Sequence, residues 1–296
     1  MNFEPFYELL PFCIVFALGA AVGSFLNVVV YRLPARLSLL HPPSSCPKCK
    51  TRLKVYDNVP VLGWLWLRGR CRSCRLPIAA RYPLVEFSCA CLFVSVYRLF
   101  GPSWATLGYW LFVCWLLVLA LIDLDTMTLP NSLTASGLIL GWLFQGWMSY
   151  LAEPALVHVV GGAAAAVGAS IFGLWLFDLI GIAGSQAFGK AAMGGGDSKL
   201  AAMMAAWLGW PGLLLATFLA AAMGAVVGGS AMAIGLLGPR QHIPFGPYLA
   251  LGAMLSLLYG RTLIAAYLSI FFPAGFLPMG FLPTCFFSAD FFLLGL

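Results

Sequence analysis

Two pairs of cysteines in the first third of the chain have the spacing of a metal-binding site. Cys46 and Cys49 form one C-x2-C pair, and Cys71 and Cys74 form a second pair after 21 intervening residues. A C-x2-C turn can direct two thiolates at one ion, and two such turns complete a tetrahedron of ligands. The pattern therefore predicts a structural zinc site, with disulfides or free thiols as the alternative.

Two aspartates, Asp123 and Asp197, lie where long apolar runs meet polar segments. Asp123 ends the run 111–122, and Asp197 follows three consecutive glycines. Ionisable groups at membrane depth are energetically costly, so they are candidates for function. If two carboxyls share a site, one can keep its proton at neutral pH while the other acts as a base. Such a pair could hydrolyse a peptide bond; the alternative is that both are boundary aspartates, one of them a helix cap.

The sequence offers no rival site for covalent or cofactor chemistry. No Gly-x-Ser-x-Gly or His-Glu-x-x-His motif occurs, and no glycine-rich nucleotide loop follows a recognisable strand. Two further aspartates, Asp125 and Asp178, are interpreted as ordinary residues of the membrane boundary.

The elements that position these side chains are expected to be membrane-spanning helices. Hydrophobic residues make up 62% of the 296 residues and charged residues 9%, whereas a soluble domain carries roughly 25% charged residues. We therefore expect an all-α membrane protein with about eight transmembrane helices and a cytoplasmic zinc-ribbon-like loop. The expected segments are 9–31, 83–100, 104–122, 132–150, 156–180, 197–210, 212–237 and 245–272. The sixth is too short to cross as a straight helix and would need shielding by its neighbours.

The basic residues predict the orientation of the chain. Residues 32–82 hold 11 of the 16 Lys and Arg residues, with Asp57 as their single acid. Loops rich in Lys and Arg remain in the cytoplasm, so the charge is interpreted as a topology signal and not as a nucleic-acid surface. The expected domains are a first transmembrane helix (1–31), a cytoplasmic tetracysteine loop (32–82), a transmembrane peptidase core (83–272) and an apolar C-terminal tail of unassigned role (273–296).

Six short motifs occur in an order that resembles one known family. They are Gly23-Ser24-Phe25-Leu26-Asn27 with Arg32-Leu33-Pro34; the cysteine pairs enclosing Asn58-Val59-Pro60; Arg81-Tyr82-Pro83-Leu84-Val85-Glu86; Asp123-Leu124-Asp125 with Leu129-Pro130; Gly194-Gly195-Gly196-Asp197-Ser198-Lys199-Leu200; and Pro244-Phe245-Gly246-Pro247-Tyr248. Over residues 19–260 the chain thus resembles the type IV prepilin peptidases, also called bifunctional leader peptidase/N-methyltransferases.

The resemblance implies a GxGD-type aspartyl endopeptidase of the bacterial inner membrane. Its substrates would be prepilins or pseudopilins of type IV pili or type II secretion systems, cut on the cytoplasmic side. The new N-terminal residue would then be methylated from S-adenosylmethionine.

Matched by motif position, the implied catalytic pair is Asp123 and Asp197. Asp123 is preferred to Asp125 because the family's aspartate precedes a proline, here Pro130, by seven residues. No residue identifies an S-adenosylmethionine pocket, although Glu86 and the loop 32–82 are candidates. Asn131 departs from the family pattern, in which many members have Asp.

Two other classes of function compete with the peptidase. One is a transporter or channel with a zinc-bearing cytoplasmic loop, and the other is a non-catalytic membrane scaffold. A transporter predicts acids near mid-membrane and an inverted repeat, and the sequence shows neither. A scaffold would keep working with alanine at Asp123, whereas a peptidase would stop.

Overall fold

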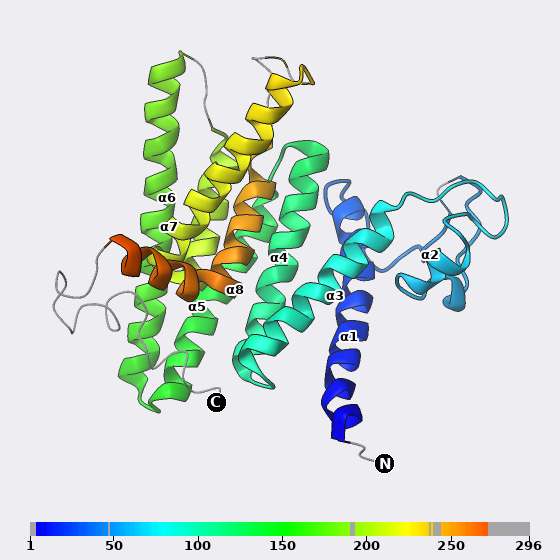
Figure 1. Ribbon diagram of the computed structural model, residues 1–296, viewed down its shortest axis with the longest axis horizontal. Coiled ribbons are helices and arrows are strands. Elements are labelled where there is room, and N and C mark those ends of the chain that lie inside the picture. The colour runs from blue at the N-terminus through cyan, green and yellow to red at the C-terminus, as the bar shows by residue number, and fades with distance from the viewer. Residues whose placement is uncertain (1–3, 47, 190–192, 237, 239–243, 272–296) are drawn as a thin grey trace. The chain divides into compact units, whose positions relative to one another are not determined.

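Helices form nearly all of the regular structure in this chain. The computed structural model describes residues 4–46, 48–189, 193–236, 238 and 244–271. Within these residues, strand-like pairing is limited to two isolated bridges, which confirms the predicted all-α class. The helices are α1 (Glu4–Arg32), η1 (Val55–Asp57), α2 (Leu62–Trp66), α3 (Arg81–Phe100), α4 (Trp104–Thr126), α5 (Asn131–Ala152), α6 (Leu156–Phe188), α7 (Gly195–Ala233) and α8 (Gly246–Phe271) (Figure 1).

The described residues divide into two compact units. The first comprises those up to Pro102 together with Tyr109–Val118, and the second comprises Ser103–Gly108 together with those from Leu119 onward. Helix α4 contributes its middle to the first unit and its two ends to the second. The first unit holds the cysteine pairs, and the second holds both candidate catalytic aspartates.

In the first unit, α1 packs along α3 at very short range. A Cβ atom added at Gly19 would lie 2.7 Å from the Cα of Ala90, and one added at Gly23 would lie 2.8 Å from the Cα of Glu86. Two glycines one turn apart therefore give α1 the flat face on which membrane helices commonly pack. This contact places Glu86 beside α1, near the start of α3.

The second unit is organised around α7, which packs against α5, α6 and α8. Every residue of the segment 200–207 is at most 5% exposed. A helix that is apolar and covered on all sides is a core element, because no face remains for solvent. The sixth predicted segment, 197–210, is too short to cross a membrane as a straight helix. In the structure its neighbours shield it, as predicted.

Helix α7 is interrupted near its middle. Gly209 has φ 69° and ψ 173°, a conformation that glycine adopts without a steric penalty. Pro211 lacks the N–H group that would donate to the carbonyl of Trp207. Gln145 of α5 donates instead, with its Nε2 atom 2.9 Å from that carbonyl oxygen. The sixth and seventh predicted segments are therefore the two halves of α7.

Six helices of the described part of the chain, α1, α3, α4, α6, α7 and α8, are long and apolar enough to cross a membrane. The predicted segments number eight because two of them lie in α7 and one corresponds to α5. Helix α5 is not among the six; it carries polar side chains such as those of Asn131 and Gln145.

The end of α6 differs from the prediction. The sequence predicts an end near residue 180, whereas the helix continues to Phe188 and is followed by Gly189 at φ 65°. The polar residues Ser185 and Gln186 reduce the apolar signal without interrupting the helix. The predicted tail 273–296 lies outside the described residues.

Candidate catalytic and metal-binding sites

Each cysteine pair lies in a turn whose hydrogen bonds are made within a few residues. In the first turn the N–H of Cys46 donates to the carbonyl of Thr51, and the N–H of Lys50 donates to the carbonyl of Cys46, both at 3.0 Å. The second turn repeats both bonds 25 positions later, at 2.9 Å. The residue after the second cysteine has φ 59° in both turns, at Lys50 and at Arg75. The two turns therefore share one backbone geometry.

The two turns bring all four sulfurs together. The Sγ atoms of Cys46, Cys49, Cys71 and Cys74 lie within 4.8 Å of one another. The Cys46–Cys74 pair is separated by 3.8 Å and the Cys49–Cys71 pair by 3.9 Å. None of the four is in a disulfide, so each sulfur is available as a metal ligand. The cluster can hold a metal ion, as the spacing predicts.

Hydrogen bonds and burial shift the pKa values of three thiols in this cluster, and in different directions. Thr51, whose hydroxyl lies 3.3 Å from Cys49 Sγ, lowers the pKa of Cys49 to about 6. A backbone hydrogen bond from Cys74 lowers the pKa of Cys71. At Cys74 the backbone N–H of Leu76 acts in the same direction, but burial and the neighbouring thiols raise its pKa to about 11. Four thiolates therefore do not form together unless a cation compensates their charge.

Glu86 attaches the cysteine loop to α3. Its side chain is 9% exposed, and its Oε2 atom accepts a hydrogen bond of 2.6 Å from the N–H of Val61. Val61 has φ 60° and ψ −55°, and the N–H of Leu62 donates to the carbonyl of Pro60 at 2.6 Å. This is the rare, strained form of γ-turn, and a β-branched residue adopts it only where the surroundings impose it. Glu86 thus fixes the turn that precedes α2.

An ion pair closes the same loop. The guanidinium group of Arg72 donates to both carboxyl oxygens of Asp57, at distances of 2.6–3.0 Å. These bonds hold the pKa of Asp57 below its usual value. The one acid of the basic loop is therefore used to connect η1 to the second cysteine turn.

Asp123 lies in the last turn of α4 and is almost completely buried. Its side chain is 6% exposed, and its Oδ2 atom accepts a hydrogen bond of 3.0 Å from the N–H of Gly246, the first residue of α8. Helix N-termini carry free N–H groups and a partial positive charge, so they stabilise a nearby carboxylate. A Cβ atom at Gly246 would lie 2.6 Å from Oδ2. Only glycine therefore fits at this position without displacing the carboxyl.

Asp197 lies in the first turn of α7, near the end of α4. Its carboxyl is close enough to that of Asp123 for the two to interact electrostatically. A Cβ atom at Gly196 would lie 3.2 Å from the side chain of Leu129, which follows α4. The Nζ atom of Lys199 donates to Oδ1 of Asn131 at 2.8 Å, which connects α7 to the start of α5. The end of α4 and the starts of α5, α7 and α8 therefore meet around the two aspartates.

The other two aspartates have different surroundings. Asp125 is exposed, because residues two apart on a helix point in nearly opposite directions and Asp123 takes the inward face. Asp178, on α6, is also exposed. Its Oδ1 atom accepts a hydrogen bond of 2.6 Å from the hydroxyl of Ser198, so it contacts the residue that follows Asp197.

Two residues of these sites received no definite role from the sequence. Gly246 belongs to one of the six family motifs, but the motif does not indicate its contact with Asp123, which is 123 positions away. The sequence makes Glu86 a candidate for S-adenosylmethionine binding, and in the structure one of its carboxyl oxygens accepts a hydrogen bond from the N–H of Val61. The sequence signal for Gly246 is a glycine followed by proline, which is typical of a helix start. No comparable signal marks Glu86.

Comparison with known proteins connects these sites to one family. A model described as the bacterial peptidase A24 N-terminal domain matches residues 17–100, and one described as the type IV leader peptidase family matches residues 110–229. The prepilin leader peptidase/N-methyltransferase of Aeromonas hydrophila is 39% identical, over 88% of this chain and 94% of its own. The chain belongs to the type IV leader peptidase family.

Other relatives carry the same name. The protein of Stutzerimonas stutzeri is 38% identical over 85% of this chain and 91% of its own, and that of Burkholderia pseudomallei (strain 1026b) is 40% identical over 85% of each. No solved structure matches. The four cysteines fall inside the match to the N-terminal domain, and both aspartates fall inside the match to the leader peptidase family.

Proposed function

We propose that Asp123 and Asp197 are the catalytic pair of an endopeptidase that cleaves the leader of type IV prepilins or pseudopilins. The observation that carries this proposal is the burial of Asp123 against the N-terminus of α8, at the end of α4 that the glycine preceding Asp197 also approaches closely. The family and the names of the relatives support the same activity. The transporter hypothesis lacks comparable support. It predicts acids near mid-membrane, whereas Asp123 and Asp197 both lie at helix ends.

The geometry suits general acid–base hydrolysis. Two neighbouring carboxyls do not both ionise easily, so one member of the pair keeps a proton. The ionised carboxyl takes a proton from water as the water oxygen attacks the scissile carbonyl carbon, and the protonated carboxyl donates to the carbonyl oxygen. The C–N bond then breaks, the carboxyl that took the proton from water gives it to the departing nitrogen, and the other carboxyl regains a proton from a hydroxyl group of the tetrahedral intermediate. The N–H of Gly246 holds the Asp123 carboxyl in one orientation during these transfers.

The chain is also proposed to methylate the new N-terminal residue. S-adenosylmethionine would supply the methyl group to the α-amino nitrogen. The first unit is the candidate for this activity, because Glu86 and the strained turn at Val61 lie there, away from the aspartate pair in sequence. Strained backbone is often retained at ligand sites.

We propose that the metal held by the four cysteines is zinc and that its role is structural. Zinc–sulfur bonds of about 2.3 Å in a tetrahedron separate the sulfurs by about 3.8 Å. Two of the six separations, 3.8 and 3.9 Å, match this value, and all six are at most 4.8 Å. Four thiolates leave no open coordination position, so the ion would stabilise residues 32–82 and would not activate water.

The membrane is proposed to be the bacterial inner membrane, with residues 32–82 in the cytoplasm. The cluster of Lys and Arg in this loop supports that orientation. A thiol reagent that cannot cross the inner membrane should not modify Ser44→Cys in whole cells, as measured by the mass of the peptide that contains position 44. Pro102→Cys, on the turn between α3 and α4, is the matched position that should be modified. Modification at 44 without lysis would overturn the orientation.

One assay tests the main proposal. Purified protein is incubated with a prepilin, with and without S-adenosylmethionine, and the product masses are measured. Cleavage without the methyl donor and an added methyl group of about 14 Da with it are expected, because hydrolysis needs only water and methylation needs a donor. An intact prepilin under both conditions would refute the peptidase proposal.

A further inference from the structure

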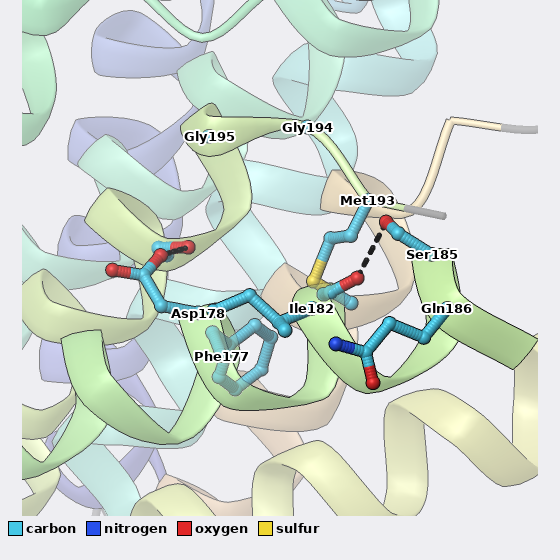
Figure 2. A pocket seen from close by; sticks show the side chains of 10 residues that line it. Phe177, Asp178, Ile182, Ser185, Gln186, Met193, Gly194 and Gly195 are labelled. Atoms are coloured by element: carbon cyan, nitrogen blue, oxygen red, sulfur yellow. Dashed lines mark hydrogen bonds between the residues drawn. The ribbon is translucent and has the colours of Figure 1, made fainter. Parts of the chain in front are cut away.

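A pocket of about 530 Å³ lies beside the start of α7, within the second unit (Figure 2). Helix α6 lines it with Phe177, Asp178, Ile182 and Gln186, and the segment before α7 lines it with Met193 and Gly194. Gly195 and Ser198 also border it, so the lining brackets Asp197 on both sides. The pocket therefore borders the helix turn that carries Asp197, although the Asp197 side chain is not itself part of the lining.

The pocket carries one formal charge. Among its ten described lining residues, Asp178 is the single ionisable side chain. Oδ1 of Asp178 accepts a hydrogen bond of 2.6 Å from Ser198, while Oδ2 accepts none from any described residue. Because a carboxylate has about four lone-pair sites, Asp178 retains capacity for a donor that enters the pocket. Its exposure leaves it accessible to such a donor.

The remaining lining is suited to an aliphatic chain. Phe177, Ile182 and Met193 supply apolar surface, and Figure 2 shows their side chains near Asp178 and the Gln186 amide. A Lys or Arg side chain combines a methylene stem with a cationic head, and it is most stable where the stem meets apolar atoms and the head meets a carboxylate. A neutral polar side chain would leave Asp178 without an opposite charge. An acidic side chain would be repelled.

We propose that this pocket is a specificity subsite that binds a Lys or Arg side chain of the peptide substrate close to the scissile bond. The inference rests on the proposed peptidase function of Asp123 and Asp197. Ser198 is adjacent to Asp197, and adjacent residues are about 3.8 Å apart along the chain. A side chain in the pocket therefore belongs to one of the few substrate residues nearest the cleavage point. Ser198 orients the Asp178 carboxyl toward that side chain.

A pair of substrates tests the subsite. Two prepilin peptides differ only in one residue among the four before the scissile bond, Lys in one and Gln in the other, and compete in one reaction with the wild-type protein. The Lys peptide should be favoured in kcat/KM by about fivefold, the upper range for an exposed ion pair. Asp178→Asn keeps the oxygen that accepts from Ser198 but removes the charge, so the preference should disappear. Asp125→Asn, an exposed acid on α4, is the matched control and should keep the preference.

Charge reversal gives an independent readout. Asp178→Lys should reverse the selectivity, so that a Glu peptide is cleaved faster than the Lys peptide. If the wild type cleaves the Lys and Gln peptides equally, or if Asp178→Asn retains the preference, the subsite is refuted while the peptidase proposal stands. If the wild type cleaves neither peptide nor intact prepilin, the peptidase proposal itself has failed.

Discussion

The cysteine cluster and the aspartate pair are assembled over very different lengths of chain. Cys46 and Cys74 are 28 positions apart, and hydrogen bonds within each turn already orient their sulfurs. Asp123 instead depends on Gly246, which is 123 positions away, while Asp197 is presented by a third helix. The first site is encoded by short segments, whereas the second exists only when α4, α7 and α8 are packed.

This difference predicts that the two sites fail in different ways. A site built from local turns tolerates changes in distant helices, because its geometry does not depend on their packing. A site built where helix ends meet is sensitive to any shift of one helix relative to another, and misplacement by about 1 Å can reduce a rate by about 10²-fold. Variants of each site should therefore leave the other intact.

The largest effect is expected from Asp123→Asn or Asp197→Asn. Each change keeps the side-chain shape but removes a carboxyl needed for proton transfer, so prepilin cleavage should fall on the order of 10²–10⁴-fold. Methylation of an already cleaved pilin and the metal content should both be unchanged. Asp125→Asn is the matched control and should cleave at nearly the wild-type rate. Near-normal cleavage by either variant, or an essential Asp125, would contradict the assignment.

A smaller effect is expected from Gly246→Ala, which tests the packing and not the chemistry. The added methyl group would lie 2.6 Å from Asp123 Oδ2 and 3.0 Å from its Cγ, so the carboxyl has to move. Cleavage should fall by about 10²-fold, measured as kcat on a prepilin. Gly229→Ala on α7 is the control, because nothing lies within 4 Å of the added atom. Equal rates for the two variants would show that the close contact does not position Asp123.

The smallest effect on cleavage is expected from the double change Cys71→Ser and Cys74→Ser. Metal content should fall from about one zinc per chain to none, because two thiolates do not replace four. Cleavage should fall less than in Gly246→Ala, since the aspartate pair lies in the other unit. Cys13→Ser, on an exposed face of α1, should retain the metal. Zinc-free wild-type protein, prepared without chelators, would contradict the metal assignment.

The cysteine cluster could be predicted from the sequence because spacing alone determines which sulfurs meet. The break in α7 could also be anticipated, since Gly209 and Pro211 interrupt an apolar run. The end of α6 could not: Ser185 and Gln186 are polar, but they permit helix, and the backbone turns only at Gly189.

The aspartate site was less accessible to prediction. The positions of Asp123 and Asp125 in one helix show that a single one can point inward, but the inward face depends on which helices surround α4. The motif position selected Asp123, and the structure shows it buried. The contact with Gly246 required knowledge of tertiary packing, because no local rule connects positions so far apart.

The break in α7 predicts that Gln145 and Pro211 change together during evolution. Gln145 supplies the donor that Pro211 cannot, and the two positions are 66 apart in the sequence. Replacing Gln145 by Leu alone leaves the Trp207 carbonyl unpaired in a buried setting, at a cost of roughly 1–3 kcal/mol. Replacing Pro211 alone restores a backbone donor that competes with the amide. A lineage that straightens this helix is therefore expected to change both residues, and Gln145 is free to vary only after the proline has been lost.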